Sequence, residues 1–135
     1  TTNTRDALFC LDASNGKIIW ENYDPVLPDT ASPVVTENYL FMATAPGVVS
    51  CINTDDGSIL WEKELNQVFY SSPVLADQKI FVTDIKGNTQ IFEAAGEYTP
   101  VGRPQLYEQV VATPAFVNDK IVMRGKKHLF LIGEQ

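Results

Sequence analysis

The stretch CLDASNGKIIW at residues 10–20 returns as CINTDDGSILW at residues 51–61, and this repetition decides the fold. The cysteine, the glycine and the tryptophan keep their spacing in both copies, with a step of 41 residues. Self-similarity at a fixed step of roughly 20–50 residues is typical of repeat proteins, in which each unit is one small supersecondary structure. Gly16, Trp20, Gly57 and Trp61 are therefore the candidate structural residues of the repeat.

A second motif repeats in phase with the first. Ser-Pro-Val at 32–34 returns at 72–74, and as Thr-Pro-Ala at 113–115, with steps of 40 and 41 residues. The third copy of the tryptophan segment is worn, because Gly96 is present but Tyr98 stands near the position expected for tryptophan. A fourth copy stops within residues 129–133. The whole chain is thus predicted to be built from one kind of unit.

Each unit is predicted to contain four short strands, which in the complete copy cover 32–36, 39–45, 48–53 and 58–65. Turn residues at 37–38, 45–47 and 55–57 separate them. These residue types supply the positive φ angles and side-chain-to-backbone hydrogen bonds that hairpins need. One alternative is a helix over 59–69, which lacks Gly and Pro and spaces Trp61, Leu65 and Phe69 four residues apart.

Four strands in a step of about 40 residues are typical of a β-propeller blade. We therefore predict an all-β fold, a partial propeller of four-stranded antiparallel blades with about three blade-equivalents. The predicted units are a half blade at 5–29, blades at 30–70 and 71–110, and an incomplete last blade at 111–135. Propellers close with about four to eight blades. The chain is thus expected to be the C-terminal part of a longer propeller, or to complete a ring with a second copy.

Composition excludes several classes of partner. The chain has 17 acidic and 10 basic residues and a net charge of −7, which argues against nucleic acid, since phosphate binding relies on Lys and Arg. No apolar run is long enough to predict a membrane span. Cys10 and Cys51 hold the same repeat position in successive units. Such positions usually lie beyond the Cα separation of about 7 Å that a disulfide tolerates, so both thiols are expected to be reduced and buried.

Residues 10–20 resemble the quinoprotein-type (PQQ-like) propeller repeat, usually Ala-x-Asp-x-x-Thr-Gly-Lys-x-x-Trp. Residues 51–61 depart from that pattern at Asn53, Asp56 and Ser58 but keep the glycine and the tryptophan. The resemblance implies that each repeat tryptophan packs between blades, on the glycine-containing turn of a neighbour. It also implies a bacterial, extracytoplasmic protein (periplasmic, lipoprotein or secreted), nearer the outer-membrane-assembly lipoprotein propellers than the quinone-dependent dehydrogenases.

Three functions are compatible with this resemblance. The first is a non-catalytic scaffold that binds a protein or ligand; the second is a fragment of a pyrroloquinoline quinone (PQQ)-dependent dehydrogenase whose cofactor site lies in missing blades. The third is an accessory propeller attached to a catalytic domain. The sequence lacks a calcium-binding loop of the Asp-x-Asp-x-Asp-Gly type, and its single histidine, His128, is interpreted as a surface residue. We therefore favour the scaffold, without catalytic, cofactor or metal residues; PQQ and Ca²⁺ belong only to the dehydrogenase hypothesis.

The region 94–110 is the least regular, with Gly96, Pro100, Gly102 and Pro104 where an outer strand and a tryptophan should lie. It is either a drifted repeat or a protruding contact loop. In the second case Tyr98, Arg103 and Tyr107 would be the contact residues, since Tyr and Arg are enriched at interfaces. The partners expected are a protein or the remaining blades of a longer chain, with self-association through uncovered blade faces.

Overall fold

The computed structural model describes residues 7–133, and all regular structure in that range is β. Its strands are β1 (Leu8–Leu11), β2 (Ile18–Asn22), β3 (Val34–Val35), β4 (Tyr39–Ala43), β5 (Val48–Asn53), β6 (Ile59–Glu64), β7 (Val74–Ala76), β8 (Lys79–Thr83), β9 (Thr89–Glu93), β10 (Pro100–Gly102), β11 (Ala115–Val117), β12 (Lys120–Arg124) and β13 (Leu129–Ile132). The prediction of an all-β chain is confirmed. The helix considered for 59–69 is wrong, because β6 pairs along β5 from Val48 to Ile52.

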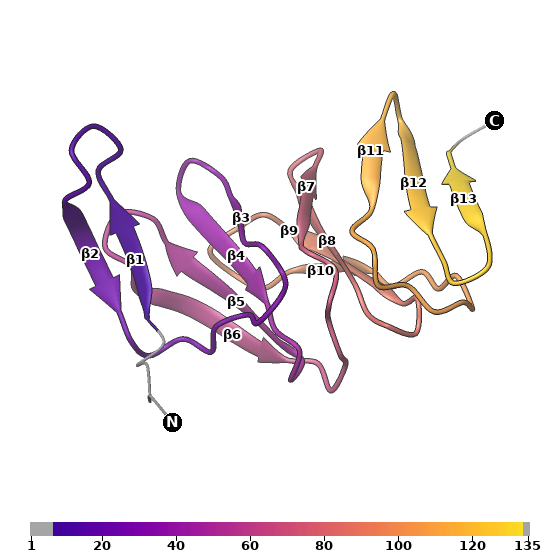
Figure 1. Ribbon diagram of the computed structural model, residues 1–135, viewed down its shortest axis with the longest axis horizontal. Helices are drawn as coiled ribbons and strands as arrows, with labels where there is room; N and C mark the ends of the chain where they lie inside the picture. The colour runs from indigo at the N-terminus through magenta and orange to yellow at the C-terminus, as the bar shows by residue number, and fades with distance from the viewer. Residues whose placement is uncertain (1–6, 134–135) are drawn as a thin grey trace.

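The strands form four antiparallel sheets in which chain neighbours are also sheet neighbours. They are β1–β2, β3–β6, β7–β10 and β11–β13. Figure 1 shows them side by side in chain order, from the indigo β1–β2 pair to the yellow β13. This arrangement is an open, partial propeller, as predicted. Residues 5 and 6 of the predicted half blade and residues 134 and 135 of the predicted last blade lie outside the described range.

The middle sheets are buried on both faces because a neighbour covers each side. In β4, Phe41, Met42 and Ala43 are each at most 1% exposed although successive side chains point to opposite faces. A sheet of this kind cannot bury both faces alone, so it depends on the units before and after it. Sheet stacking, rather than any single sheet, therefore makes the core.

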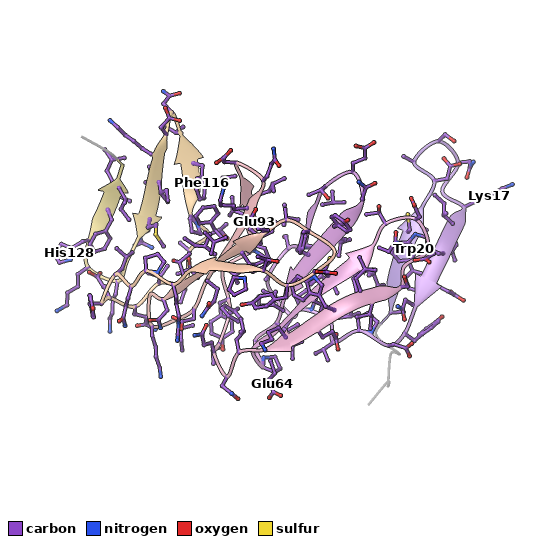
Figure 2. The ribbon with its side chains drawn as sticks, turned by 180° about the vertical axis from the view of Figure 1, so that it is seen from behind. Lys17, Trp20, Glu64, Glu93, Phe116 and His128 are labelled. Atoms are coloured by element: carbon purple, nitrogen blue, oxygen red, sulfur yellow. The ribbon has the colours of Figure 1, made fainter. Side chains whose placement is uncertain are left out.

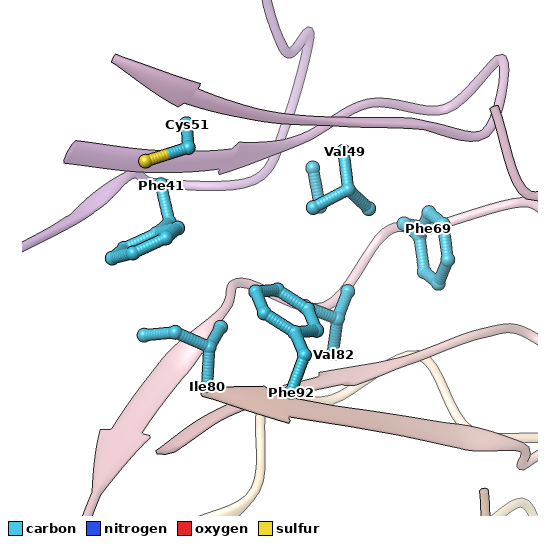
Figure 3. Close-up of a cluster of buried hydrophobic side chains, with 8 residues drawn as sticks. Phe41, Val49, Cys51, Phe69, Ile80, Val82 and Phe92 are labelled. Atoms are coloured by element: carbon cyan, nitrogen blue, oxygen red, sulfur yellow. The ribbon is translucent and has the colours of Figure 1, made fainter. Parts of the chain in front are cut away.

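The main core lies between the β3–β6 sheet and the β7–β10 sheet (Figure 3). Phe41, Val49 and Cys51 come from the first sheet and meet side chains of the second, with Phe69 from the connection between them. All four are fully buried. Burying one large apolar side chain contributes about 1.5–3 kcal/mol, so this interface supplies much of the stability that joins the two sheets.

The two cysteines are free, but their burial differs. Cys51 is fully buried, its Sγ donates to the carbonyl of Ala95 (3.7 Å), and burial raises the pKa of its thiol to about 12. Cys10 is only half-buried, so the expectation that both thiols are buried is wrong for this one. The reason is that β1 has a strand neighbour on one side alone among the described residues.

Candidate functional site

The repeat tryptophans lie between sheets. The Trp20 indole, on β2, donates from Nε1 to the carbonyl oxygen of Thr54 at 2.8 Å, in the turn between β5 and β6. Its ring lies so close over Gly57 that a Cβ added to this glycine would fall against the ring. Gly57 also has a φ of +75°, a conformation that favours glycine. Two properties of one glycine, its backbone conformation and its lack of a side chain, thus seat the indole of the preceding unit.

Trp61 makes the same kind of contact one unit later. Its Nε1 donates to the carbonyl oxygen of Ala95 at 3.2 Å, again 34 residues further along the chain. Its ring centroid lies 5.6 Å from that of Phe92 and 5.2 Å from that of Tyr98, both at steep interplanar angles. Edge-to-face pairs of this kind add to the hydrophobic gain. Tyr98 lies 41 residues after Gly57, so an aromatic ring contacts this tryptophan where the previous unit has a glycine.

Gly16 differs from Gly57 in its surroundings. Its φ is +71°, but a Cβ added there would meet no described atom within 4 Å. Asp12 organises the same turn, because its carboxylate accepts from the amide of Ser14 at 2.8 Å and from the side chain of Asn15. These hydrogen bonds hold the pKa of the Asp12 carboxyl below its usual value. Gly16 is therefore required by the turn and not by a packed ring.

A second tie between sheets uses the start of each unit, and sequence reasoning missed its role. The amide of Ser32 donates to Oγ of Ser72 at 2.9 Å, and the amide of Ser72 donates to Oγ1 of Thr113 at 3.0 Å. The repeat steps of 40 and 41 residues are also the separations of these hydrogen-bonded partners. The Ser-Pro and Thr-Pro motifs thus connect consecutive units through hydroxyl acceptors.

The third unit lacks its tryptophan, and its register corrects the sequence prediction. Trp61 pairs with Cys51 across β6 and β5. The corresponding pair in the third unit is Gly102 with Ile91, across a register shift between Pro100 and Gly102. Gly102, and not Tyr98, therefore holds the tryptophan position. The prediction failed because the irregular pairing of β10 moves the equivalent residue four places along the chain.

The three proposed contact residues are not brought together at one point. Tyr98 is half-buried against Trp61, with Lys63 Nζ 5.9 Å from its ring centroid. Arg103 is exposed, and its Nε donates to the Gln67 side-chain oxygen at 3.2 Å when that amide is oriented to suit its donors. Tyr107 is 86% exposed. Its φ of +56° is unusual for a tyrosine.

Arg103 and Tyr107 nevertheless belong to one continuous loop face. The segment 104–106 runs beside the turn between β8 and β9, since Thr89 donates to the carbonyl of Pro104 and Leu106 to that of Gly87. A small pocket of about 160 Å³ opens there; its lining includes residues 65–68, Asp84 and Arg103. Asp84 is 2% exposed and accepts from the amides of Lys86 and Asn88 at 2.8 and 2.9 Å. The loop face is thus polar at its base and held by backbone hydrogen bonds.

Glu108 ties this loop to the last sheet. Its carboxylate accepts from the backbone amides of Lys127 and His128, and its Oε2 lies 2.8 Å from His128 Nδ1. The amide of Lys127, followed by the side chain of His128, lowers the pKa of the Glu108 carboxyl to about 2. His128, labelled in Figure 2 at the end of the row opposite Trp20, is therefore exposed but paired. Sequence reasoning missed Glu108, since nothing local links residues 20 apart.

The described residues do not fit a PQQ and calcium centre. Within residues 7–133, no three His, Cys, Asp or Glu side chains are placed to hold a metal ion. The rings of Trp20 and Trp61 are already packed, on Gly57 and on Phe92 with Tyr98. Neither indole therefore serves as a stacking floor for a planar quinone. In the same described range, no helix has the length and apolar character needed to cross a membrane.

The chain is similar to two kinds of known protein. It is 27% identical over 88 residues to the outer membrane protein assembly factor BamB of Yersinia pestis, covering 64% of this chain and 22% of that protein. It is 28% identical over 120 residues to the quinoprotein alcohol dehydrogenase PedH of Pseudomonas putida, covering 78% of this chain and 18% of that enzyme. The chain thus spans about a fifth of the length of these relatives.

The fold is shared with a solved BamB. The crystal structure of BamB from Moraxella catarrhalis superimposes with a TM-score of 0.70 at 14% identity, covering 96% of this chain and 40% of that one. A family model described as outer membrane protein assembly factor BamB matches residues 5–130. The resemblance to PQQ-like repeats nearer the assembly lipoproteins is confirmed. The chain therefore belongs to the BamB family of PQQ-like β-propeller proteins.

Proposed function

We propose that this chain is a non-catalytic scaffold of outer membrane protein assembly, forming the C-terminal part of a longer, extracytoplasmic propeller that binds a protein partner. The family match and the relatives named as assembly factors support this role. The stacked sheets form a rigid frame, and the loop face with Arg103 and Tyr107 is the proposed contact surface. Function in repeat and propeller proteins commonly lies on loops that such a frame positions.

Tyr107 carries the proposal. An 86% exposed tyrosine on a backbone with φ of +56° exposes a large apolar ring and adopts a conformation that costs about 1 kcal/mol or more. The neighbouring hydrogen bond from Leu106 to Gly87 at 3.0 Å holds the segment in place. Tyr and Arg are the residue types most enriched in the energetically important centres of interfaces. Burial of this ring against a partner is the function that fits its cost.

The test is photo-crosslinking in the parent bacterium with a photoreactive phenylalanine analogue at position 107. The matched control is the same analogue at position 70, where Tyr70 is 47% exposed. We expect one discrete adduct with an outer-membrane-assembly protein from position 107, weakened by an added Arg103→Ala substitution, and none from position 70. Equal adducts from both positions, or none from position 107, would contradict the proposed contact surface.

The dehydrogenase hypothesis predicts a different observation. Equilibrium dialysis of the full-length parent protein with PQQ and Ca²⁺ should show no retained quinone if the protein is a scaffold. Stoichiometric quinone retention, together with reduction of an electron-accepting dye in the presence of an alcohol, would replace the scaffold with an oxidoreductase.

A further inference from the structure

The last two sheets meet around a cavity that has no counterpart in the preceding interface. It measures about 350 Å³, and its lining includes Phe81 and Ile91 from the third unit with Ile121, Met123 and Ile132 from the fourth. An engineered cavity of about 150 Å³ with apolar walls stays dry and binds benzene. A cavity of about twice that volume accommodates a two-ring aromatic group.

The repeat explains why this space is empty of side chains. In the preceding interface, Phe41, Cys51 and Trp61 form one row across three strands. The corresponding row in the third unit is Phe81, Ile91 and Gly102. The row faces the last sheet, because the ring centroid of Phe81 lies 4.9 Å from that of Phe116 on β11. Gly102 thus removes an indole from the side of the cavity that the third unit provides.

A second ring is missing from the opposite side. Phe92 pairs with Ile80 in the third unit, and Ile132 pairs with Ile121 at the corresponding place in the fourth. Phe92 contacts Trp61 in the preceding interface, at 5.6 Å between ring centroids. An isoleucine therefore stands where that interface has a phenylalanine, and a glycine stands where it has a tryptophan. The cavity is the volume of these aromatic groups.

The geometry points to a binding site for a small, flat, apolar aromatic molecule of indole size, held between the last two sheets where the preceding interface has Trp61. The walls are suited to such a ring because they are almost entirely apolar, and desolvating apolar surface drives binding. Gln105 and Thr89 supply the few polar groups at the lining. Sites of this kind combine apolar walls with a small number of polar groups. The inference is independent of the proposed protein partner.

Gly102 allows a direct test, because a tryptophan at this position should fill the site from within. Its φ is not in the left-handed region, and an added Cβ would meet no described atom within 4 Å. Indole should raise the unfolding midpoint of the wild-type chain by about 3–6 °C at saturation. Gly102→Trp should raise the midpoint without indole and reduce the response to indole at least tenfold. Val101→Trp, one residue away at a half-exposed position, is the matched control and should keep the response.

A measurement on the wild-type chain keeps the test valid if Gly102→Trp fails to fold. Nuclear Overhauser contacts should appear between indole protons and the methyl groups of Ile91, Met123 and Ile132. N-acetyltryptophanamide, which carries the same ring on a peptide backbone, should bind more weakly because its amides would enter an apolar cavity. Equal or tighter binding of this amide would assign the site to a protein side chain. Absence of methyl contacts, or a shift that depends on protein concentration instead of indole, would also overturn the proposal.

Discussion

At the scale of residues, one glycine and one indole define how consecutive units meet. The Trp20 ring covers Gly57, and its Nε1–H is satisfied by the carbonyl of Thr54. Burying an indole requires an acceptor for its N–H, since an unpaired buried donor costs about 1–3 kcal/mol. The turn between β5 and β6 provides both the flat surface and the acceptor. The repeat spacing of glycine and tryptophan is thus a consequence of contacts between units, as well as of turns within them.

Substituting the two repeat glycines should separate the cost of the turn from the cost of the packed ring. Gly16→Ala should lower the free energy of unfolding by about 1–2 kcal/mol, because its φ is positive and its surroundings are open. Gly57→Ala should cost about 1–3 kcal/mol more, since the new Cβ must displace the Trp20 ring. Chemical denaturation of both variants measures the difference. Equal losses would mean that the ring does not rest on Gly57.

Trp61→Ala should lower the free energy of unfolding by about 3–5 kcal/mol, the usual cost of deleting a large buried aromatic side chain. Trp61→Phe should lose less, because it keeps apolar contact with Phe92 and loses only part of the ring and the donor to Ala95. Leu60→Ala, at the adjacent and 40% exposed position, is the control and should cost less than about 1 kcal/mol. A loss below 1 kcal/mol for Trp61→Ala would show that its ring is not buried between sheets.

At the scale of strands and loops, the sequence predicted most elements and missed the contacts between distant ones. The four strands of the second unit could be predicted because its turns carry residues with a known backbone role, such as Asp56 and Gly57. The tryptophan position of the third unit could not, since the register shift at β10 is set by pairing with β9. Glu108 was equally invisible, because its partners lie on a hairpin 20 residues away.

The tie made by Glu108 should appear as a pH-dependent stability difference between wild type and Glu108→Gln. The folded pKa of this carboxyl is about 2, below its ordinary value of 4.5. Its contribution is therefore fully present above about pH 4.5 and is lost as the pH falls toward 2. Urea denaturation across that range should show the two proteins converging in stability at low pH.

The exposed position 97 supplies the control for this measurement. Glu97→Gln removes a carboxylate from the same acidic chain without touching the hairpin at Lys127 and His128. Its stability profile should follow that of wild type through the whole range. A constant gap between wild type and Glu108→Gln from pH 6 to pH 2 would contradict the tie.

At the scale of the whole molecule, the two end sheets expose apolar side chains that the middle sheets bury. On β1 and β2, Leu11, Ile18 and Ile19 are each at least 55% exposed, and on β13 the exposed residues are Leu129 and Leu131. An open strand edge with such residues is a template for pairing with another chain. A stacked array with uncovered end faces associates unless charge or capping residues prevent it.

We expect the isolated chain to self-associate despite its net charge of −7. Sedimentation across a concentration series should show a mass that rises with concentration, and Leu129→Lys with Leu131→Lys should reduce it by placing charge on the open edge of β13. The control is Val35→Lys, at an exposed position on β3 in an interior sheet. A strict monomer at high micromolar concentration would show that the end faces are not adhesive.

The stacking of consecutive units through their tryptophans is tested most directly by the indole N–H protons of Trp20 and Trp61. Each donates to a carbonyl 34 residues further along the chain, at Thr54 and Ala95. In NMR spectra of the folded chain, we predict slow exchange of both protons and nuclear Overhauser contacts to residues 54–57 for Trp20 and 94–98 for Trp61. Rapidly exchanging indole protons, with contacts confined to their own unit, would contradict the stacked arrangement.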